Sequence, residues 1–311
     1  MKFHPDFWAL IIGGSSGFGL AAAQKLAAHG MNLCIVHRDR RGAMPRITPE
    51  FEELKQTGVK FLSFNLDALS ESGRTLVLDT LSAEMGTAGK IRMALHSVAF
   101  GNLKLLAPYP APETPGQTRH RIAVAAGIPA DRMDRVIADE FEGGADCLHT
   151  LADPPAYDNT RFLEADDFSR TISAMGFNLV EWVRDIFKRN LFASDARVLS
   201  LTSEGGRKAW RGYAAVSAAK SVLESAARSM ALEFAPFGIR SNIIQAGVTD
   251  TAALRIIPGS RHLKANAILR NPFGRLTRPS DVANVIYLLC LDEAAWINGA
   301  VISADGGEGI A

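Results

Sequence analysis

The stretch WALIIGGSSGFGLAAAQKL, residues 8–26, joins an apolar run to a helical pattern through a turn rich in glycine. The apolar run predicts a buried strand, and the alanine-rich segment after it predicts a helix that ends at Gly30. Gly13, Gly17 and Gly19 lie between the two. Glycines in this place let the backbone approach a pyrophosphate, and the helix N-terminus offers unpaired N–H groups. The stretch therefore predicts a nucleotide site, although glycines also serve turns that bind nothing.

Short apolar runs and helical patterns alternate from this stretch to about residue 101. Continuous apolar runs such as LCIV, residues 33–36, are typical of strands buried on both faces. Strand–helix–strand units at this spacing predict a parallel sheet with helices on both sides, a doubly wound, Rossmann-like α/β fold. The pattern resumes after residue 162. There we expect a helix over 166–189, a strand over 196–203, a helix around 220, a strand over 238–247, a helix over 280–290 and a last strand over 299–307.

The segment from about residue 102 to 162 departs from this alternation. Proline-rich stretches at 107–118 and 151–160 bracket it, and proline continues neither a helix nor a central strand. Between them, residues 121–141 have enough apolar positions for one or two short helices. We therefore predict one domain over 1–311 with a partly helical insertion over about 102–162. The insertion is expected to form a lid, a wall of the ligand crevice or a surface for a partner.

The bulk properties of the chain exclude several classes of function. A net charge of +1 over 311 residues provides no field that would attract nucleic acid. No apolar run approaches the roughly 18 residues of a membrane-spanning helix, and the N-terminus lacks a signal-peptide cleavage site. The three cysteines are isolated, which indicates neither a disulfide framework nor a metal site. We therefore expect a cytoplasmic protein that binds neither nucleic acid nor membranes.

After the second expected strand the chain reads HRDRRGAM, residues 37–44. A site that prefers NADH ends this strand with an acid, which holds the ribose 2′-hydroxyl. Here basic side chains, among them His37 and Arg38, crowd the position, and Asp39 is the one acid. Positive charge suits a 2′-phosphate, which favours NADPH. The alternative is a solvated basic loop in which Asp39 serves NADH.

Three further features accompany the glycine-rich turn: Tyr213, Lys220 and the closing ISADGG at 302–307. Together they resemble the short-chain dehydrogenase/reductase family over residues 1–101 and 163–309. Most members of that family carry Tyr-x-x-x-Lys, whereas six residues separate the pair here. The wider spacing, with HSVAFG at 96–101 and IIQAGVTDT at 243–251, resembles the divergent branch that contains the enoyl-acyl carrier protein reductases.

This resemblance implies that Tyr213 and Lys220 are catalytic. Residues seven apart on a helix lie about 20° out of line, and helical side chains lean toward the N-terminus. Lys220 is therefore expected to reach back toward Tyr213, where its charge would favour the phenolate and lower the pKa of the phenol. In the family the lysine also binds the nicotinamide ribose. The alternative is that Tyr213 packs as an ordinary aromatic residue and Lys220 is solvated.

Ser203 bears on the substrate. Ketone reductases of the family have a catalytic serine in this region, whereas typical enoyl reductases have a second tyrosine ten residues before the catalytic one. Ketone reductases also have an asparagine midway along the fourth helix, where this chain has Met175 and, in a different helical phase, Asn178. Ser203 is therefore predicted to donate to the substrate oxygen, or else it simply ends a strand.

The remaining candidate residues come from the resemblance. Residues 251–275 fall where the family keeps a mobile substrate loop. Six apolar side chains there suit an acyl channel: Leu254, Ile256, Ile257, Leu263, Ile268 and Leu269. Four basic ones suit an acyl carrier protein or CoA, or else form a solvated face: Arg255, Arg261, Lys264 and Arg270. The predicted cofactor-binding residues are Gly13, Ser16, Gly17, Phe18, Gly19, His37, Arg38, Asn65, Leu66, Ser97, Val98, Lys220, Gly247, Val248 and Thr251.

These observations predict an NADPH-dependent reductase that acts on the C2–C3 double bond of an enoyl thioester, carried by CoA or by an acyl carrier protein. The resemblance also implies a homo-oligomer, a tetramer or a dimer. One alternative is a short-chain carbonyl reductase or alcohol dehydrogenase, which Ser203 favours. Another is a non-catalytic NADP(H)-binding protein whose insertion engages a partner.

Overall fold

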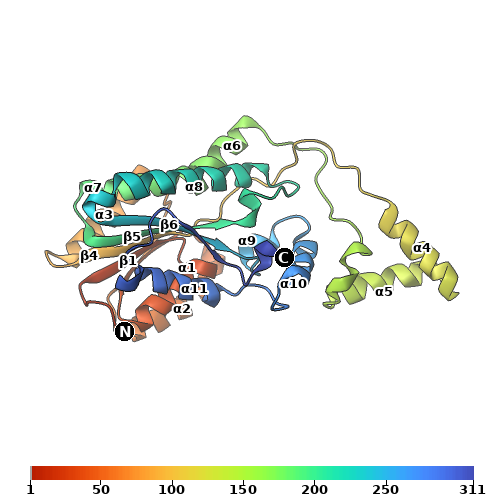
Figure 1. The fold of residues 1–311 in the computed structure, drawn as a ribbon, viewed down its shortest axis with the longest axis horizontal. Coiled ribbons are helices and arrows are strands. Elements are labelled where there is room, and N and C mark those ends of the chain that lie inside the picture. Colours follow the sequence, from red (N-terminus) through yellow and green to blue (C-terminus); the bar gives the residue numbers. More distant parts are fainter. Residues whose placement is uncertain (1) are drawn as a thin grey trace.

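The computed structural model describes residues 2–311, and across them seven strands form one parallel sheet (Figure 1). The strand order is β3-β2-β1-β4-β5-β6-β7. Successive strands are added on one side of β1 up to β3 and on its other side from β4 onward, so the winding of the sheet reverses between β1 and β4. The strands are β1 Phe7–Ile12, β2 Asn32–His37, β3 Phe61–Asn65, β4 Lys90–His96, β5 Phe192–Ser203, β6 Ile239–Ala246 and β7 Val301–Ala304. This arrangement confirms the predicted doubly wound α/β fold.

Helices cover both faces of the sheet. The α-helices are α1 Gly17–Ala28, α2 Met44–Gln56, α3 Glu71–Met85, α4 Thr114–Ala126, α5 Ala130–Glu142, α6 Ala165–Ile172, α7 Asn178–Lys188, α8 Ala214–Glu233, α9 Ala252–Arg255, α10 Ser260–Arg270 and α11 Pro279–Cys290. Helices α3, α7 and α8 pack on one face, and α1, α2 and α11 pack on the other. No helix within residues 2–311 is both long and apolar enough to cross a membrane.

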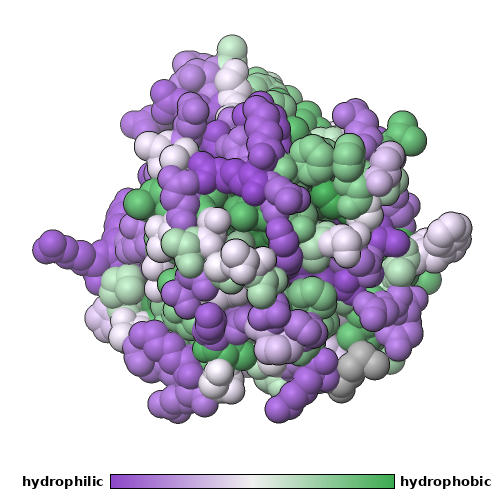
Figure 2. Space-filling model, turned by 90° about the vertical axis from the view of Figure 1, so that its left-hand side faces the viewer, coloured by the Kyte–Doolittle hydropathy of each residue, from purple (hydrophilic) through white to green (hydrophobic). Residues whose placement is uncertain are grey.

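Alternation along β1 explains how a continuous apolar strand serves two cores. Leu10 and Ile12 belong to the cluster beneath α3, α7 and α8, whereas Ala9 and Ile11 belong to the cluster beneath α1, α2 and α11. All four are fully buried. Successive side chains of a strand point to opposite faces, so a strand covered on both sides has no polar face. Figure 2 views the molecule from the end of the sheet opposite α4 and α5, where hydrophilic side chains dominate and hydrophobic ones gather in separate patches.

Three details differ from the expected elements. The helix expected over 166–189 is interrupted by a π-helical segment, Ser173–Phe177, which separates α6 from α7. Strand β5 begins at Phe192, four residues before its predicted start. Helix α3 was not predicted, although its start is marked in the sequence: the Ser70 hydroxyl accepts a hydrogen bond from the Gly73 N–H at 3.0 Å, as an N-cap does.

The insertion, predicted to contain one or two short helices, contains two, α4 and α5, which form a hairpin that projects from the body (Figure 1). The base of the hairpin packs against α10, where Phe141 and Ala152 surround Ala265. Arg261 of α10 fixes this contact, since its guanidinium bonds the Phe141 carbonyl and forms an ion pair with Asp146 at 2.5 Å. The insertion therefore packs against α10, within the segment 251–275 that was expected to form a substrate loop.

Candidate active site

The glycine-rich turn between β1 and α1 leaves no room for side chains. Gly13 has φ +90°, and a Cβ there would lie 2.4 Å from the carbonyl oxygen of Ser97. A Cβ on Gly19 would lie 2.1 Å from the carbonyl oxygen of Gly13, so the helix approaches the strand as closely as backbone allows. Ser16 is the N-cap of α1, and its side chain makes no capping hydrogen bond. The first N–H groups of α1 are thus left for an anion at this end of the helix.

A cavity of about 730 Å³ opens over this turn, beside the point where the strand order reverses. Such switch points are where open α/β sheets bind ligands. Nine of the predicted cofactor-binding residues line this cavity: Gly13, Ser16, Gly17, Phe18, His37, Arg38, Ser97, Val98 and Thr251. Three others, Lys220, Gly247 and Val248, line an adjoining cavity. Gly19, Asn65 and Leu66 line neither.

The basic segment after β2 is ordered by its own side chains. The ring of His37 is buried against Phe51, and its Nδ1 lies 2.9 Å from a carboxylate oxygen of Asp39. Asn65 bonds both backbone groups of Asp39, at 2.9 and 3.0 Å, which accounts for its absence from the cavity wall. Arg38 is exposed and lies 3.4 Å from Asp67. Arg38 and Asp39 both line the cavity, so each cofactor alternative keeps its residue there.

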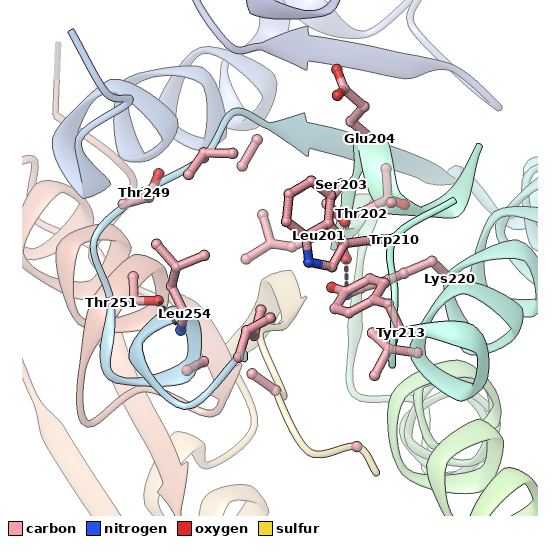
Figure 3. A pocket seen from close by; sticks show the side chains of 18 of the residues that line it. Leu201, Thr202, Ser203, Glu204, Trp210, Tyr213, Lys220, Thr249, Thr251 and Leu254 are labelled. Atoms are coloured by element: carbon pink, nitrogen blue, oxygen red, sulfur yellow. Dashed lines mark hydrogen bonds between the residues drawn. The ribbon is translucent and has the colours of Figure 1, made fainter. Parts of the chain in front are cut away.

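The adjoining cavity contains the predicted catalytic residues Tyr213, Lys220 and Ser203 (Figure 3). Most of its wall is apolar. Of the six apolar residues expected from the substrate loop, four line it, Leu254, Ile256, Ile257 and Leu263, whereas Ile268 and Leu269 do not. The two cavities adjoin and share wall residues, among them Phe18, Ser97, Val98 and Thr251.

Tyr213 is held by a tight turn and not by a helix. Helix α8 begins at Ala214, and Tyr213 is its N-cap, with φ −110° and ψ 4°. The Tyr213 N–H bonds the Trp210 carbonyl at 3.2 Å, and Gly212 has φ +70°, as the third position of a type II turn requires. The expectation that residues 213 and 220 both lie within one helix is therefore wrong for Tyr213, which precedes the first helical residue.

Lys220 is buried, and its Nζ donates to the Leu201 carbonyl at 2.7 Å. Burial lowers the pKa of Lys220 to about 8, and the nearby Glu224 carboxylate opposes this shift. Glu224 accepts a hydrogen bond from the Thr202 hydroxyl at 2.8 Å, which fixes the carboxylate beneath the site. The lysine is thus a desolvated cation on the cavity wall and not a solvated one.

The expected lowering of the tyrosine pKa is not found. Burial raises the pKa of Tyr213, and the hydroxyl of Ser203 beside it acts in the opposite direction. The ammonium group is directed at the Leu201 carbonyl, so its charge does not dominate the phenol. In this structure Tyr213 is a neutral hydrogen-bond donor at ordinary pH.

Met175, in the π-helical segment, and Asn178, the first residue of α7, lie in different surroundings. Met175 lines the substrate cavity, which makes this part of the wall apolar. Asn178 is buried outside the cavity and donates to the Ala68 carbonyl and to Glu181, both at 3.2 Å. The extra residue of a π turn shifts the helical phase between these two positions. Met175 therefore occupies the cavity wall, as the resemblance suggested.

A cluster of charged side chains lies at the cavity wall, and its two glutamates were not foreseen from the sequence. Glu204 and Glu308 line the cavity, and Arg270 of α10 bonds both carboxylates, at 3.0 and 3.2 Å. Burial raises the pKa of Glu308, which also accepts the Val248 N–H at 3.0 Å. Arg270 thereby ties α10 to the segment after Ser203 and to the C-terminus. These residues are far apart in sequence and form no local motif.

The basic side chains of the substrate loop are paired within the chain. Arg255 and Lys264 lie 2.9 and 3.9 Å from Asp250, Arg261 lies beside Asp146, and Arg270 bonds the two glutamates just described. Each charge already has an internal partner. Of the described residues 102–162, Leu103 alone lines either cavity, so the insertion does not cover the site directly.

A family model described as enoyl-(acyl carrier protein) reductase matches residues 136–308, which include the tyrosine and the lysine. Cis-4-hydroxycyclohexanecarboxylate dehydrogenase of Sinomonas cyclohexanicum is 26% identical over 300 residues, covering 96% of this chain and 95% of that protein. Acetoacetyl-CoA reductase of Shinella zoogloeoides is 36% identical over 115 residues, covering 37% of this chain and 47% of that protein.

One similar solved structure is the Bacillus cereus enoyl-acyl carrier protein reductase with NADP⁺ and indole naphthyridinone. It matches with a TM-score of 0.74 at 19% identity, covering 100% of this chain and 99% of that one. At this identity the likeness concerns the fold.

Proposed function

The chain belongs to the short-chain dehydrogenase/reductase family and is an NAD(P)-dependent oxidoreductase, and we propose that it reduces the C2–C3 double bond of an enoyl thioester. The observation that carries this proposal is the place of Tyr213 and Lys220, on the wall of a mostly apolar cavity that adjoins the cavity over the glycine-rich turn.

The residues over the turn fit a dinucleotide. The missing side chains at Gly13 and Gly19 let β1 and α1 meet closely beneath the cavity, and the N-terminus of α1 suits a pyrophosphate. Ser97, Val98 and Thr251 border both cavities and would hold the middle of the molecule. When bound, the cofactor supplies the hydride.

Each catalytic residue has a role that its environment supports. The neutral phenol of Tyr213 donates a hydrogen bond to the carbonyl oxygen of the thioester. Negative charge gathers on that oxygen as the β-carbon is reduced, and a donor fixed in a dry cavity stabilises it. Lys220, a desolvated cation behind the phenol, adds to this stabilisation, and by resemblance to the family it would also bind the ribose. The α-carbon then takes a proton from water or from a relayed group.

The preferred cofactor is proposed to be NADPH. Arg38 and Arg40 line the cavity where the ribose 2′-phosphate would lie, while the Asp39 carboxylate is already engaged by the His37 ring. The experiment compares NADPH and NADH in the wild type and in Arg38→Ser. We expect the substitution to raise the KM for NADPH severalfold and to leave that for NADH unchanged; an equal effect on both would contradict the assignment.

Ser203 favours a second candidate, the reduction of a carbonyl group. Its hydroxyl lies beside Tyr213, and two donors at one oxygen suit a ketone as well as a thioester. Two relatives are named as a dehydrogenase of a hydroxylated ring acid and as an acetoacetyl-CoA reductase. The four basic side chains of the loop that could bind CoA or a carrier protein are paired with acidic residues of this chain. The proposal therefore covers enoyl thioesters of either carrier.

The decisive measurement is NADPH oxidation with crotonyl-CoA and acetoacetyl-CoA side by side. The proposed function predicts that the wild type turns over the enoyl thioester with the higher kcat/KM. A preference for acetoacetyl-CoA would replace it by the carbonyl reductase. NADPH binding with no turnover of either compound, or of a wider panel of ketones, would point to a non-catalytic protein.

A further inference from the structure

The indole of Trp210 lines the substrate cavity, and the proposed chemistry makes no use of it. The side chain is half-buried, but its Nε1 is sealed from water and has no hydrogen-bond partner among residues 2–311. The buried Trp182 shows the contrast, because its Nε1 donates to the Ala68 carbonyl at 3.0 Å. Leaving a buried donor without an acceptor costs free energy, so such a group at a binding cavity indicates a ligand atom that accepts from it.

The position of this indole is coupled to that of the catalytic phenol. Trp210 and Tyr213 are the first and last residues of the type II turn, closed by their backbone hydrogen bond. The turn is also held from outside, since the Arg211 guanidinium lies 4.2 Å from the ring centre of Tyr109 in the insertion. Figure 3 shows the indole nitrogen and the phenol oxygen directed into the same part of the cavity. One turn therefore places two donors together.

We propose that the Trp210 N–H donates a hydrogen bond to the same substrate oxygen that Tyr213 binds. A carbonyl oxygen has two lone pairs and accepts from two donors. Both bonds strengthen as negative charge develops on that oxygen, so the indole contributes to turnover as well as to binding. The ligand class is a carbonyl compound: either a ketone or aldehyde that is reduced at its carbonyl carbon, or an enoyl compound that is reduced at a carbon conjugated to the carbonyl group. This inference rests on the proposed function only for the choice of the enoyl thioester as probe.

The first test observes the indole directly. The chain has four tryptophans, so a ¹⁵N-labelled sample gives four indole N–H resonances, and the one missing from Trp210→Phe is assigned to Trp210. Through-bond assignment replaces this step if the variant does not fold. The wild type with NADP⁺, which has no hydride to give, is titrated with crotonyl-CoA and then with S-butyl-CoA, a thioether without the carbonyl. We expect a downfield shift with the first compound and none with the second.

The second test is kinetic. Trp210→Phe keeps an aromatic ring and removes the donor, so we expect kcat/KM to fall about 10- to 100-fold, mostly through kcat, with the Kd for NADPH unchanged. Trp296→Phe is the matched control, since Trp296 is 97% exposed and is expected to keep wild-type rates. Unchanged kinetics in Trp210→Phe would overturn the inference.

The outcomes separate this inference from the proposed function. If crotonyl-CoA is turned over but the Trp210 resonance does not move, the inference fails and the function stands. If only ketones are turned over, the titration is repeated with the ketone and with its methylene analogue. A shift with the ketone alone then supports the indole donor although the enoyl assignment has failed. Equal shifts of the Trp210 resonance with the ketone and with its methylene analogue would show a changed environment and no hydrogen bond to the carbonyl oxygen. That result would also overturn the inference.

Discussion

The two ends of the joined cavity are built in different ways. Over the glycine-rich turn the cavity rests on a strand-to-helix turn that closes only because Gly13 and Gly19 have no side chains. At the other end the wall is made of side chains from β5, the Trp210–Tyr213 turn, α10 and the C-terminus. Under the proposed function, the first end would bind the cofactor through features that all dinucleotides share, and the second would bind the substrate. Changes at the two ends should therefore damage different kinetic constants.

The largest effect expected at the substrate end follows removal of one oxygen atom. Tyr213→Phe deletes the donor and keeps the ring, so we expect kcat to fall about 10²- to 10³-fold while the Kd for NADPH stays within about twofold. Stopped-flow turnover and cofactor fluorescence titration measure the two constants. A large loss of NADPH affinity would show that the two ends are not independent.

The backbone end is tested by adding one methyl group. Gly13→Ala places a Cβ against the Ser97 carbonyl in a left-handed conformation, which should cost about 3 kcal/mol and weaken NADPH binding about 100-fold. Denaturant unfolding and the same titration measure the loss. Gly42→Ala is the matched control, because nothing lies within 4 Å of a Cβ there. Equal behaviour of the two variants would remove the role assigned to the turn.

The pH dependence should reflect the buried lysine. The ammonium form is the active one, and burial has lowered its pKa to about 8, so the charge is present below pH 8 and is lost as the pH rises through that value. We expect kcat/KM to fall about tenfold per pH unit above roughly 8. Tyr213 does not ionise in this range, because burial raises its pKa. A profile that stays flat to pH 10 would contradict the assignment.

The smallest expected effect concerns how the substrate loop is fastened. Arg270→Ala breaks the contacts of α10 with Glu204 and Glu308, so we expect the KM for substrate to rise roughly 5- to 30-fold, equivalent to about 1–2 kcal/mol. The Kd for NADPH should not change. Arg255→Ala removes an exposed pair on the same loop and is expected to change the KM about twofold at most. Similar KM values for Arg270→Ala and Arg255→Ala would show that the contacts of Arg270 with the two glutamates do not fasten the loop.

The backbone end was predictable from the sequence and the substrate end only in part. Glycine patterns report backbone geometry locally, so the turn at Gly13 and Gly17 and the sheet around it were located correctly, whereas their role in cofactor binding stays a prediction. Tyr213 and Lys220 were found on the cavity wall, but the turn that holds the phenol was missed, since its signal is one glycine at 212. Trp210 was missed because a lone aromatic residue in a loop carries no periodic pattern.

Tertiary contacts explain the other misses. The pKa of Tyr213 depends on how deeply the phenol is buried, and burial arises from segments more than 100 residues apart in the chain. Asn65 was assigned to the adenine pocket, yet its amide holds the backbone of Asp39 on the neighbouring strand end. The loop arginines were predicted to meet a carrier or to form a solvated face, and their pairing with acidic residues, among them Asp146 of the insertion, was not foreseen. Such pairings cannot be inferred from local spacing.

The shared wall between the cavities has a consequence for inhibition. Phe18, Val98 and Thr251 border both spaces, so a ligand in either cavity would lie against the same three side chains. A flat aromatic compound resting on these three side chains would overlap the position of each natural ligand. Such a compound would compete with both in steady-state assays, and enlarging Val98 would confer resistance at the expense of both binding steps.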